Sequence, residues 1–472
     1  MVRTTREHEL KLIASDDFRL SDLQGVELPS RDFVSTYFDT PDLSLARNRI
    51  TLRHRAEEGS RLWQLKIPSG AARIEIEVPG SPAHPPSELL ALVVVHLRGV
   101  KPVRVARLRT RRKTLRTDGA EIVEDSVSVI EGQRVKARFR ELEVELVAGG
   151  DERTLRRLKK RLLGVGAEPA EFRPKLSRAL DLAPSPGRSS LPLNCPPQQV
   201  VGAALAKQHA ELVAHDPGTR LGTDAEDLHQ MRVATRRARA FLRAARPLID
   251  QEWADELRSE LGWLGAALGP ARDLDVLVER LRSQISNLGG EGASVRGLVD
   301  GLERRRRKAR ASAVAALSEE RYLALLDRLE DPQPPPASTG ASATLAELWW
   351  AEFVRTRRRF EKLNRGSSDD ELHAARIRVK RTRYAAELAA NELGAPGERF
   401  VDAAKLLQDV LGEHQDAFVA EEHIRAWSEA KPDAGDAVRK LLKRERARRR
   451  KARAEWPQAW KLLDRRARKA RP

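Results

Sequence analysis

Apolar and polar residues alternate one by one in several short segments of the first 180 residues. In the segments at 74–78 (IEIEV) and 142–146 (LEVEL), every second residue is apolar. A period of two is typical of a β-strand that buries one face. We therefore predict a β-rich first domain, with helices at 86–98 and 152–163.

The pattern changes near residue 198, where apolar residues begin to recur at helical spacing and strand signals disappear. This change predicts an all-α second domain. Residues 183–197 are rich in Pro and Ser and lack any period, so we interpret them as a linker. A second break at 331–344 divides the helical part into halves at about 198–330 and 345–470.

The two helical halves share sequence. The segment LHQMRV at 228–233 returns as LHAARI at 372–377, which is 144 residues later. Leu268-Gly269 with Asp273 returns 143 residues later as Leu411-Gly412 with Asp416. Two matches at nearly one offset indicate a repeated helical unit, which we expect to pack about a pseudo-two-fold axis.

Net charge narrows the choice of partner. The chain of 472 residues carries 87 Lys and Arg against 69 Asp and Glu, a formal charge of +18. Such a surplus attracts polyanions, although an Arg-rich codon bias is an alternative source of part of it. Aromatic residues make up only 4% and do not interleave with the basic segments, so nucleic acid is a poor candidate.

The sequence also disfavours a disulfide-bonded, a secreted or a membrane-spanning protein. Cys195 is the only cysteine, so no intrachain disulfide is expected. Residues 1–11 are charged without an apolar core, unlike a signal peptide. No stretch approaches the roughly 20 apolar residues of a membrane span. We predict a cytoplasmic protein without a membrane partner.

Charged residues fill one face of most predicted strands. A strand with a solvated polar face explains any one such set. Full sets of both signs favour a polar barrel interior, in which a phosphate chain and a divalent metal match the buried charges. The sets are Glu7, Glu9 and Lys11; Arg47, Arg49, Arg53 and Arg55; Arg73, Glu75 and Glu77; Arg107, Arg109 and Arg111; and Glu141, Glu143 and Glu145.

In their order along the chain, these motifs resemble the CYTH domain of the triphosphate tunnel metalloenzymes. The resemblance covers residues 1–182 and implies an antiparallel eight-stranded β-tunnel barrel with flanking helices. It also implies hydrolysis of a triphosphate or, less often, cyclisation of ATP. The motifs are Glu7-x-Glu9-x-Lys11, Tyr37-Phe38-Asp39-Thr40, Leu52-Arg53-His54-Arg55, Trp63-Gln64-Leu65-Lys66, Glu75-x-Glu77, the arginines at 109–112, Asp125 and Glu141-x-Glu143.

The resemblance also implies roles for individual residues. Mg²⁺ or Mn²⁺ would be held by Glu7, Glu9, Glu141 and Glu143. The catalytic set would be Glu143, Glu145 and Lys66, with a carboxylate orienting water. The sequence leaves open which arginine of 107–112 and which glutamates of 141–145 act. The triphosphate-binding set would be Lys11, Arg53, Arg55, Lys66, Glu75, Glu77, Arg109, Arg111 and Lys175.

Basic side chains also form a stripe on one helix of each repeat. A solvated basic face is the alternative explanation, yet stacked like charges repel, so a nearly pure stripe in both copies favours an anionic partner. Glu387 occupies the position of Arg243 in the second copy. The stripes are His229, Arg232, Arg236, Arg239 and Arg243, and then His373, Arg376, Lys380 and Arg383.

The segments LHQMRVATRRARAFLR, LHAARIRVKRTRYAAEL, LGPARDLDVL and LQDVLGEHQDAFVA together resemble the CHAD domain, a helical domain often fused to CYTH. The resemblance covers about 198–470 and implies two pseudo-symmetric four-helix bundles whose basic groove binds inorganic polyphosphate through both stripes. We therefore predict a metal-dependent inorganic triphosphatase acting on tripolyphosphate or a nucleoside triphosphate. A non-catalytic polyphosphate-binding protein is the main alternative, and an adenylate cyclase is a minor one.

Overall fold

A computed structural model describes residues 3–7, 9–15, 17–70, 72–147, 150–169, 174–183, 192, 195–338, 343–431 and 435–472. The chain divides into two compact units. The first comprises residues 1–188 with 216–221, and the second comprises 189–215 with 222–472. Most of the expected linker at 183–197 lies outside the described residues.

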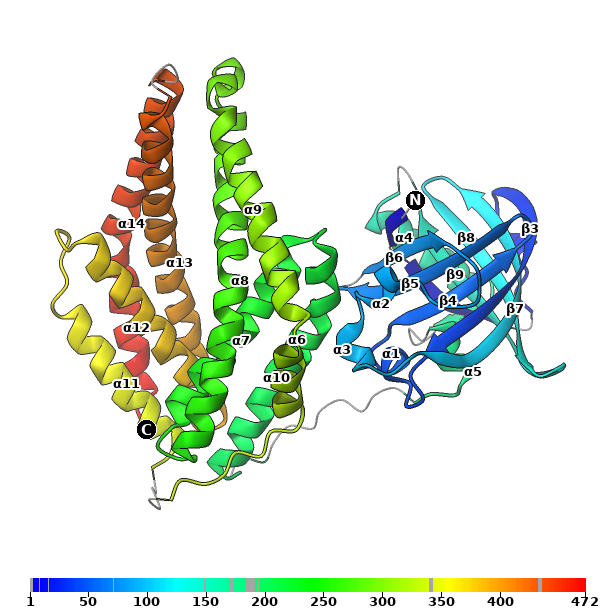
Figure 1. The fold of residues 1–472 in the computed structure, drawn as a ribbon, viewed down its shortest axis with the longest axis horizontal. Helices are drawn as coiled ribbons and strands as arrows, with labels where there is room; N and C mark the ends of the chain where they lie inside the picture. The colour runs from blue at the N-terminus through cyan, green and yellow to red at the C-terminus, as the bar shows by residue number, and fades with distance from the viewer. Residues whose placement is uncertain are drawn as a thin grey trace. The chain divides into compact units, whose positions relative to one another are not determined.

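The first unit is built on one antiparallel sheet (Figure 1). Its strand order is β1-β6-β5-β4-β3-β7-β8-β9-β2-β10. This open, ten-stranded order corrects the expectation of a closed eight-stranded barrel. The strands are β1 (Arg3–Glu7), β2 (Glu9–Ala14), β3 (Val26–Asp39), β4 (Thr51–Glu57), β5 (Ser60–Ser69), β6 (Ala72–Pro79), β7 (Val103–Thr117), β8 (Ala120–Glu131), β9 (Arg134–Leu146) and β10 (Ala167–Pro169).

A break in the first extended segment accounts for part of this difference. Residues 3–7 pair with β6, whereas residues 9–14 pair with β9, at the other side of the strand order. One residue separates the two segments, so the chain itself connects the two sides of the sheet. The short β10 adds the outermost strand by pairing with β2.

The apolar faces of several strands point outward and are covered by helices. Helix α4 (Glu152–Gly164), capped by Asp151, packs Leu158 and Leu162 on Leu142 and its neighbours. The short helices α2 (Ser87–Leu90) and α3 (Val94–Leu97), which replace the single helix expected at 86–98, pack on β4, β5 and β6. Covering these faces leaves the charged faces to line the interior.

The second unit consists mainly of helices (Figure 1). Its described connections are not helical, and an isolated β-bridge joins Ile249 to Pro336. The repeat found in the sequence appears as matched helices, in which α6 to α9 correspond to α11 to α14. No described helix has the length and apolar character required to cross a bilayer. The helices are α6 (Pro197–Leu221), α7 (Ala225–Ala245), α8 (Gln251–Ser286), α9 (Arg296–Leu317), α10 (Glu320–Glu330), α11 (Leu345–Phe360), α12 (Asp369–Leu388), α13 (Ala390–Glu429) and α14 (Gly435–Lys469).

The two copies meet through both polar and apolar contacts. Helix α7 packs on α12, the helix that corresponds to it. A shared core joins α8 and α9 to α13 and α14 through residues such as Leu281, Leu302, Ile424 and Leu441. The basic stripes on α7 and α12 are thereby held near the contact between the copies.

Candidate functional site

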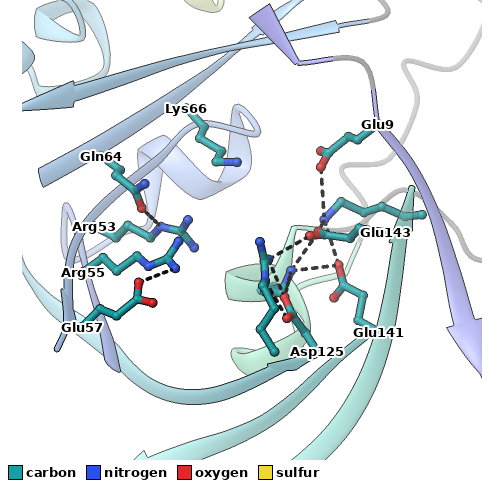
Figure 2. A network of polar contacts seen from close by, with 12 residues as sticks. Glu9, Arg53, Arg55, Glu57, Gln64, Lys66, Asp125, Glu141 and Glu143 are labelled. Carbon is teal, nitrogen blue, oxygen red and sulfur yellow. Dashed lines mark hydrogen bonds and ion pairs between the residues drawn. The ribbon is translucent and has the colours of Figure 1, made fainter. Parts of the chain in front are cut away.

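The sheet of the first unit surrounds a cavity of about 310 Å³. Side chains from eight of the ten strands line it, together with Pro174 and Lys175. Figure 2 shows a basic group around Arg53, Arg55 and Lys66 facing an acidic group that includes Glu9 and Glu143. The lining contains the cations Arg3, Lys11, Arg31, Arg53, Arg55, Lys66, Arg73, Arg112 and Lys175, and the anions Glu9, Glu57, Glu75, Glu77, Glu143 and Glu145.

Three of the acidic residues form a group that could bind a metal ion. Glu9, Glu143 and Glu145 each offer a carboxylate oxygen, and these oxygens lie within 4.8 Å of one another. The pairing of β2 with β9 brings them together, because Glu9 is opposite Glu145 and Lys11 is opposite Glu143. The Oε1 atom of Glu9 is buried and accepts no hydrogen bond from a described residue. Unmatched carboxylate oxygens of this kind suit a hard divalent cation.

Two lysines, of which Lys11 is buried and Lys175 is half-buried, neutralise the same acidic region. Lys11 Nζ donates to Glu141 Oε1 at 2.8 Å and also bonds to Glu143. Lys175 Nζ lies 2.8 Å from Glu143 Oε1 and 3.1 Å from Asp125 Oδ2. Burial opposes ionisation of Glu143, but Lys11, Lys175 and Arg112 outweigh it and hold its pKa well below the usual range. The charged carboxylate is therefore stable without a bound ion.

Two arginines, Arg53 and Arg55, lie on the opposite wall. Arg53 donates to Gln64 Oε1 at 2.8 Å and to Tyr37 Oη at 3.1 Å. Arg55 donates to Glu57 at 2.8 Å. Burial and the nearby charges of Arg53 and Arg112 lower the pKa of Arg55 to about 10. A bound anion would relieve this repulsion, and guanidinium groups match phosphate oxygens in geometry.

The arginine contributed by β7 is Arg112, which corrects the expectation of Arg109 or Arg111. Arg109 and Arg111 are exposed, whereas Arg112 lines the cavity and donates to both oxygens of Asp125 at 2.9 and 2.7 Å. Leu108 and Thr110 are buried and share the face of Arg112. The alternating arginines therefore mark the outer face of this strand.

The remaining predicted residues of this unit occupy several positions. Glu141 contacts Lys11 and Arg178 rather than joining the acidic trio. Lys66 Nζ lies 3.4 Å from Glu75, and Glu77 accepts a hydrogen bond of 2.6 Å from Gln64. Glu7 lies in β1, but its side chain is outside the described residues. Arg47 and Arg49 precede β4 and do not line the cavity.

Sequence reasoning missed several residues that line the cavity. Glu57 continues the face of Arg53 and Arg55 on β4, so the period of two could have identified it. Arg3 has the same relation to the first motif on β1. Gln64 stands two positions before Lys66 on β5. Arg31 offered no comparable signal, because β3 changes register between Leu28 and Arg31.

In the second unit, the middle of the two basic stripes forms one cluster. Arg236 Nε donates to Tyr384 Oη at 3.0 Å, which joins α7 to α12. Burial and the charges of Arg376, Arg236 and Arg383 lower the pKa of Lys380 to about 7. Burial also lowers the pKa of Arg376. Closely spaced cations that destabilise one another are suited to a polyanion.

The other stripe residues extend away from this cluster. Arg232 Nη2 lies 3.4 Å from Asp273 Oδ1, and its guanidinium lies against Gly269 of α8. His373 Nδ1 is 2.9 Å from Gln415, whereas burial and Arg272 lower the pKa of His229. Arg239 lies near Gly262 and Gly265. Arg243 instead lines a separate pocket at the end of α7.

Comparisons with known proteins find two families in this chain. Residues 5–168 match the CYTH domain family, and residues 203–425 match the CHAD domain family. The uncharacterized protein Rv2226 of Mycobacterium tuberculosis is 33% identical over 94% of this chain and 92% of its own length.

Two solved structures are also similar. PptA from Streptomyces chartreusis is 23% identical, with 57% of this chain and 100% of that chain covered and a TM-score of 0.47. The CHAD domain from the plant Ricinus communis is 22% identical, with 59% of this chain and 96% of that chain covered and a TM-score of 0.48.

Proposed function

Because the chain belongs to the CYTH and CHAD domain families, we propose that it is a metal-dependent triphosphatase whose helical unit binds inorganic polyphosphate. The observation that carries this proposal is the cavity of the first unit, whose nine basic and six acidic side chains face a common space. A phosphate chain with its divalent cation supplies both signs of charge that such a lining needs.

Glu9, Glu143 and Glu145 are the residues that would hold the metal. Mg²⁺ or Mn²⁺ prefers carboxylate oxygens, and when bound it would withdraw negative charge from the phosphate oxygens. Glu9 is best suited to this role, since its buried Oε1 has no hydrogen bond from a described residue. Our assignment differs from the set expected from the sequence by using Glu145 in place of Glu141, and it leaves out Glu7, whose side chain is outside the described residues.

The basic wall would position the substrate. Arg53, Arg55 and Arg112 would donate to phosphate oxygens, and Lys66 would neutralise the charge that develops on the leaving group. Glu145 would orient the attacking water. Its carboxylate makes no hydrogen bond or ion pair with a described residue, and burial raises its pKa, which favours accepting a proton.

Phosphate release tests this proposal. Purified protein is incubated with Mg²⁺ or Mn²⁺ and with tripolyphosphate, ATP or long-chain polyphosphate. We expect turnover of at least one substrate, and a loss of roughly tenfold or more in Glu9→Gln, a scale typical of perturbed metal sites. Glu131→Gln, an exposed change of the same kind, should retain full activity. Absence of turnover on all three substrates would reject the enzyme.

A binding protein without turnover is the second candidate. One observation favours it, because Lys11 and Lys175 already neutralise Glu143, one of the proposed metal ligands. Tight binding of tripolyphosphate without release of phosphate would support this candidate.

For the helical unit, the cluster of Arg236, Arg376, Lys380 and Arg383 is the proposed centre of the polyphosphate site. These residues come from both copies of the repeat, so a long chain of phosphates could contact the two copies at once. His229, Arg232, Arg239 and His373 would extend the site along α7 and α12.

A further inference from the structure

A pocket of about 540 Å³ lies at the carboxyl end of α7, between that helix and α8, α11 and α12. Its lining includes five arginines, at positions 243, 246, 258, 355 and 381, but only one acid, Glu352. The rest is mainly apolar, with Leu348, Ala351 and Ala385 among its members. It shares no residue with the polyphosphate site proposed above, because Arg243 of the predicted stripe lies in this pocket instead.

The five arginines differ in their partners among the described residues. Arg246 and Arg258 both bond to Asp255, at 2.8 and 2.7 Å. Arg355 bonds to Glu352 at 3.2 Å. Arg243 and Arg381 make no hydrogen bond or ion pair with a described residue. Burial and the charge of Arg243 lower the pKa of Arg381, which indicates that the two cations face each other.

The sequence repeat supplies an internal control for this arrangement. A shift of 144 residues relates Arg243 to Glu387 and relates Arg381 to Arg237. In that second location, Arg237 Nε and Glu387 Oε2 form an ion pair of 3.2 Å. One copy of the repeat therefore contains a matched pair of charges where the other contains two arginines. Arg243 is exposed, and Glu352, the one acid of the lining, already pairs with Arg355 and Arg378 at 3.2 and 3.5 Å. The positive charge of the two arginines therefore exceeds the negative charge beside them, which points to an anionic ligand.

We propose that this pocket binds a small organic phosphate, with the phosphate group between Arg243 and Arg381. Two guanidinium groups can donate several charge-assisted hydrogen bonds to one phosphate. The apolar side chains would cover the organic part of the ligand, whereas a bare phosphate chain would gain nothing from them. This inference stands independently of hydrolysis in the first unit.

The variant Arg243→Glu tests the proposal, because it installs the charge pair already present in the other copy and should therefore fold. Binding of phenyl phosphate to the full chain is measured by calorimetry. We expect Arg243→Glu and Arg381→Gln to weaken binding roughly tenfold to a hundredfold, as expected when charge-assisted hydrogen bonds are lost. The control Arg307→Glu, an exposed residue on α9 with the same charge change, should bind like the wild type.

Two further ligands, inorganic phosphate and long-chain polyphosphate, show which class of phosphate compound the pocket binds. Inorganic phosphate should bind more weakly than phenyl phosphate, because it leaves the apolar surface uncovered. Wild-type and Arg243→Glu proteins that bind phenyl phosphate equally would overturn the proposal. It would also be overturned if only long-chain polyphosphate distinguished the two proteins, since the pocket would then be an extension of the polyphosphate site.

Discussion

Lys380 is the basic residue whose charge should respond to pH near neutrality. Its pKa in the folded protein is about 7, and a bound polyanion would raise that pKa. Below pH 7 the ammonium is already charged, so binding needs no added proton. Above pH 7 binding must take up a proton, and the affinity for polyphosphate should fall as the pH rises toward the pKa of the complex.

Titration of polyphosphate binding from about one unit below to two units above pH 7 measures this effect. Lys380→Arg keeps the charge throughout that range and should flatten the pH dependence, apart from the part that comes from polyphosphate itself. An identical slope in both proteins would show that Lys380 does not carry the effect.

At the scale of individual residues, alternation predicts well which side chains of a strand share a face. It does not predict which of the two faces lines the interior of the sheet. It correctly grouped Arg53 with Arg55, and both line the cavity. On β7 it selected Arg109 and Arg111, because three alternating arginines were the more conspicuous set. The buried face of that strand carries Leu108 and Thr110 before Arg112, so burial rather than charge identifies it.

Strand β7 offers a matched test of its two faces. Arg112→Lys keeps the positive charge but loses the two-pronged contact with Asp125 and the one proposed for phosphate, so phosphate release should fall by roughly tenfold. Arg109→Lys changes an exposed residue on the same strand and should have no effect. Comparing kcat and KM for tripolyphosphate in the two variants measures this, and equal losses would contradict the orientation of the strand.

Helix α8 contains glycines that make room for arginines of the stripe on α7. A Cβ atom at Gly269 would lie 2.5 Å from Arg232 Nη1, whereas one at Gly262 would lie 3.6 Å from Arg239 Nη2. Alanine in a helix is more stable than glycine by roughly 0.5–1 kcal/mol. Gly262→Ala should therefore raise the melting temperature without affecting ligand binding.

Gly269→Ala should instead weaken polyphosphate binding, because Arg232 must move. Thermal unfolding and polyphosphate titration of both variants measure the two effects. Unchanged polyphosphate affinity in Gly269→Ala would show that the position of Arg232 does not matter for binding.

The sequence predicted the type and position of several elements better than it predicted the number of strands in the sheet. Alternation located β6 and β9, and helical spacing located α7 and α12. Alternation could not show that the first extended segment pairs with two different strands. Glu7 and Glu9 are two positions apart, so they fit the pattern of one uninterrupted strand. The three residues of β10 are too few to show an alternating pattern.

At the scale of the whole molecule, the two proposed sites should be separable by mutation. Reversing charge in Arg232→Glu with Arg376→Glu should abolish polyphosphate binding, because both copies of the repeat lose a cation. Hydrolysis of tripolyphosphate should remain largely unchanged, since the cavity of the first unit contains neither residue. Fluorescence-based binding and phosphate release measure the two activities.

The double variant Arg304→Glu with Arg307→Glu removes the same net charge from exposed positions on α9. This variant should retain most polyphosphate binding if the positions of the basic residues matter more than the net charge of the protein. Equal loss in both double variants would favour a non-specific attraction. The repeat offset predicted two copies packed about a pseudo-two-fold axis, but only the structure shows that Arg236 and Tyr384 join them.

The lysines beside Glu143 have a consequence for how the protein matures. Proteins whose metal ligands repel one another often remain unfolded until the ion arrives. Here Lys11 and Lys175 supply positive charge to those carboxylates from within the chain. We expect chelators to abolish hydrolysis without unfolding the protein. A newly synthesised molecule should then fold when metal is scarce and bind the ion afterwards.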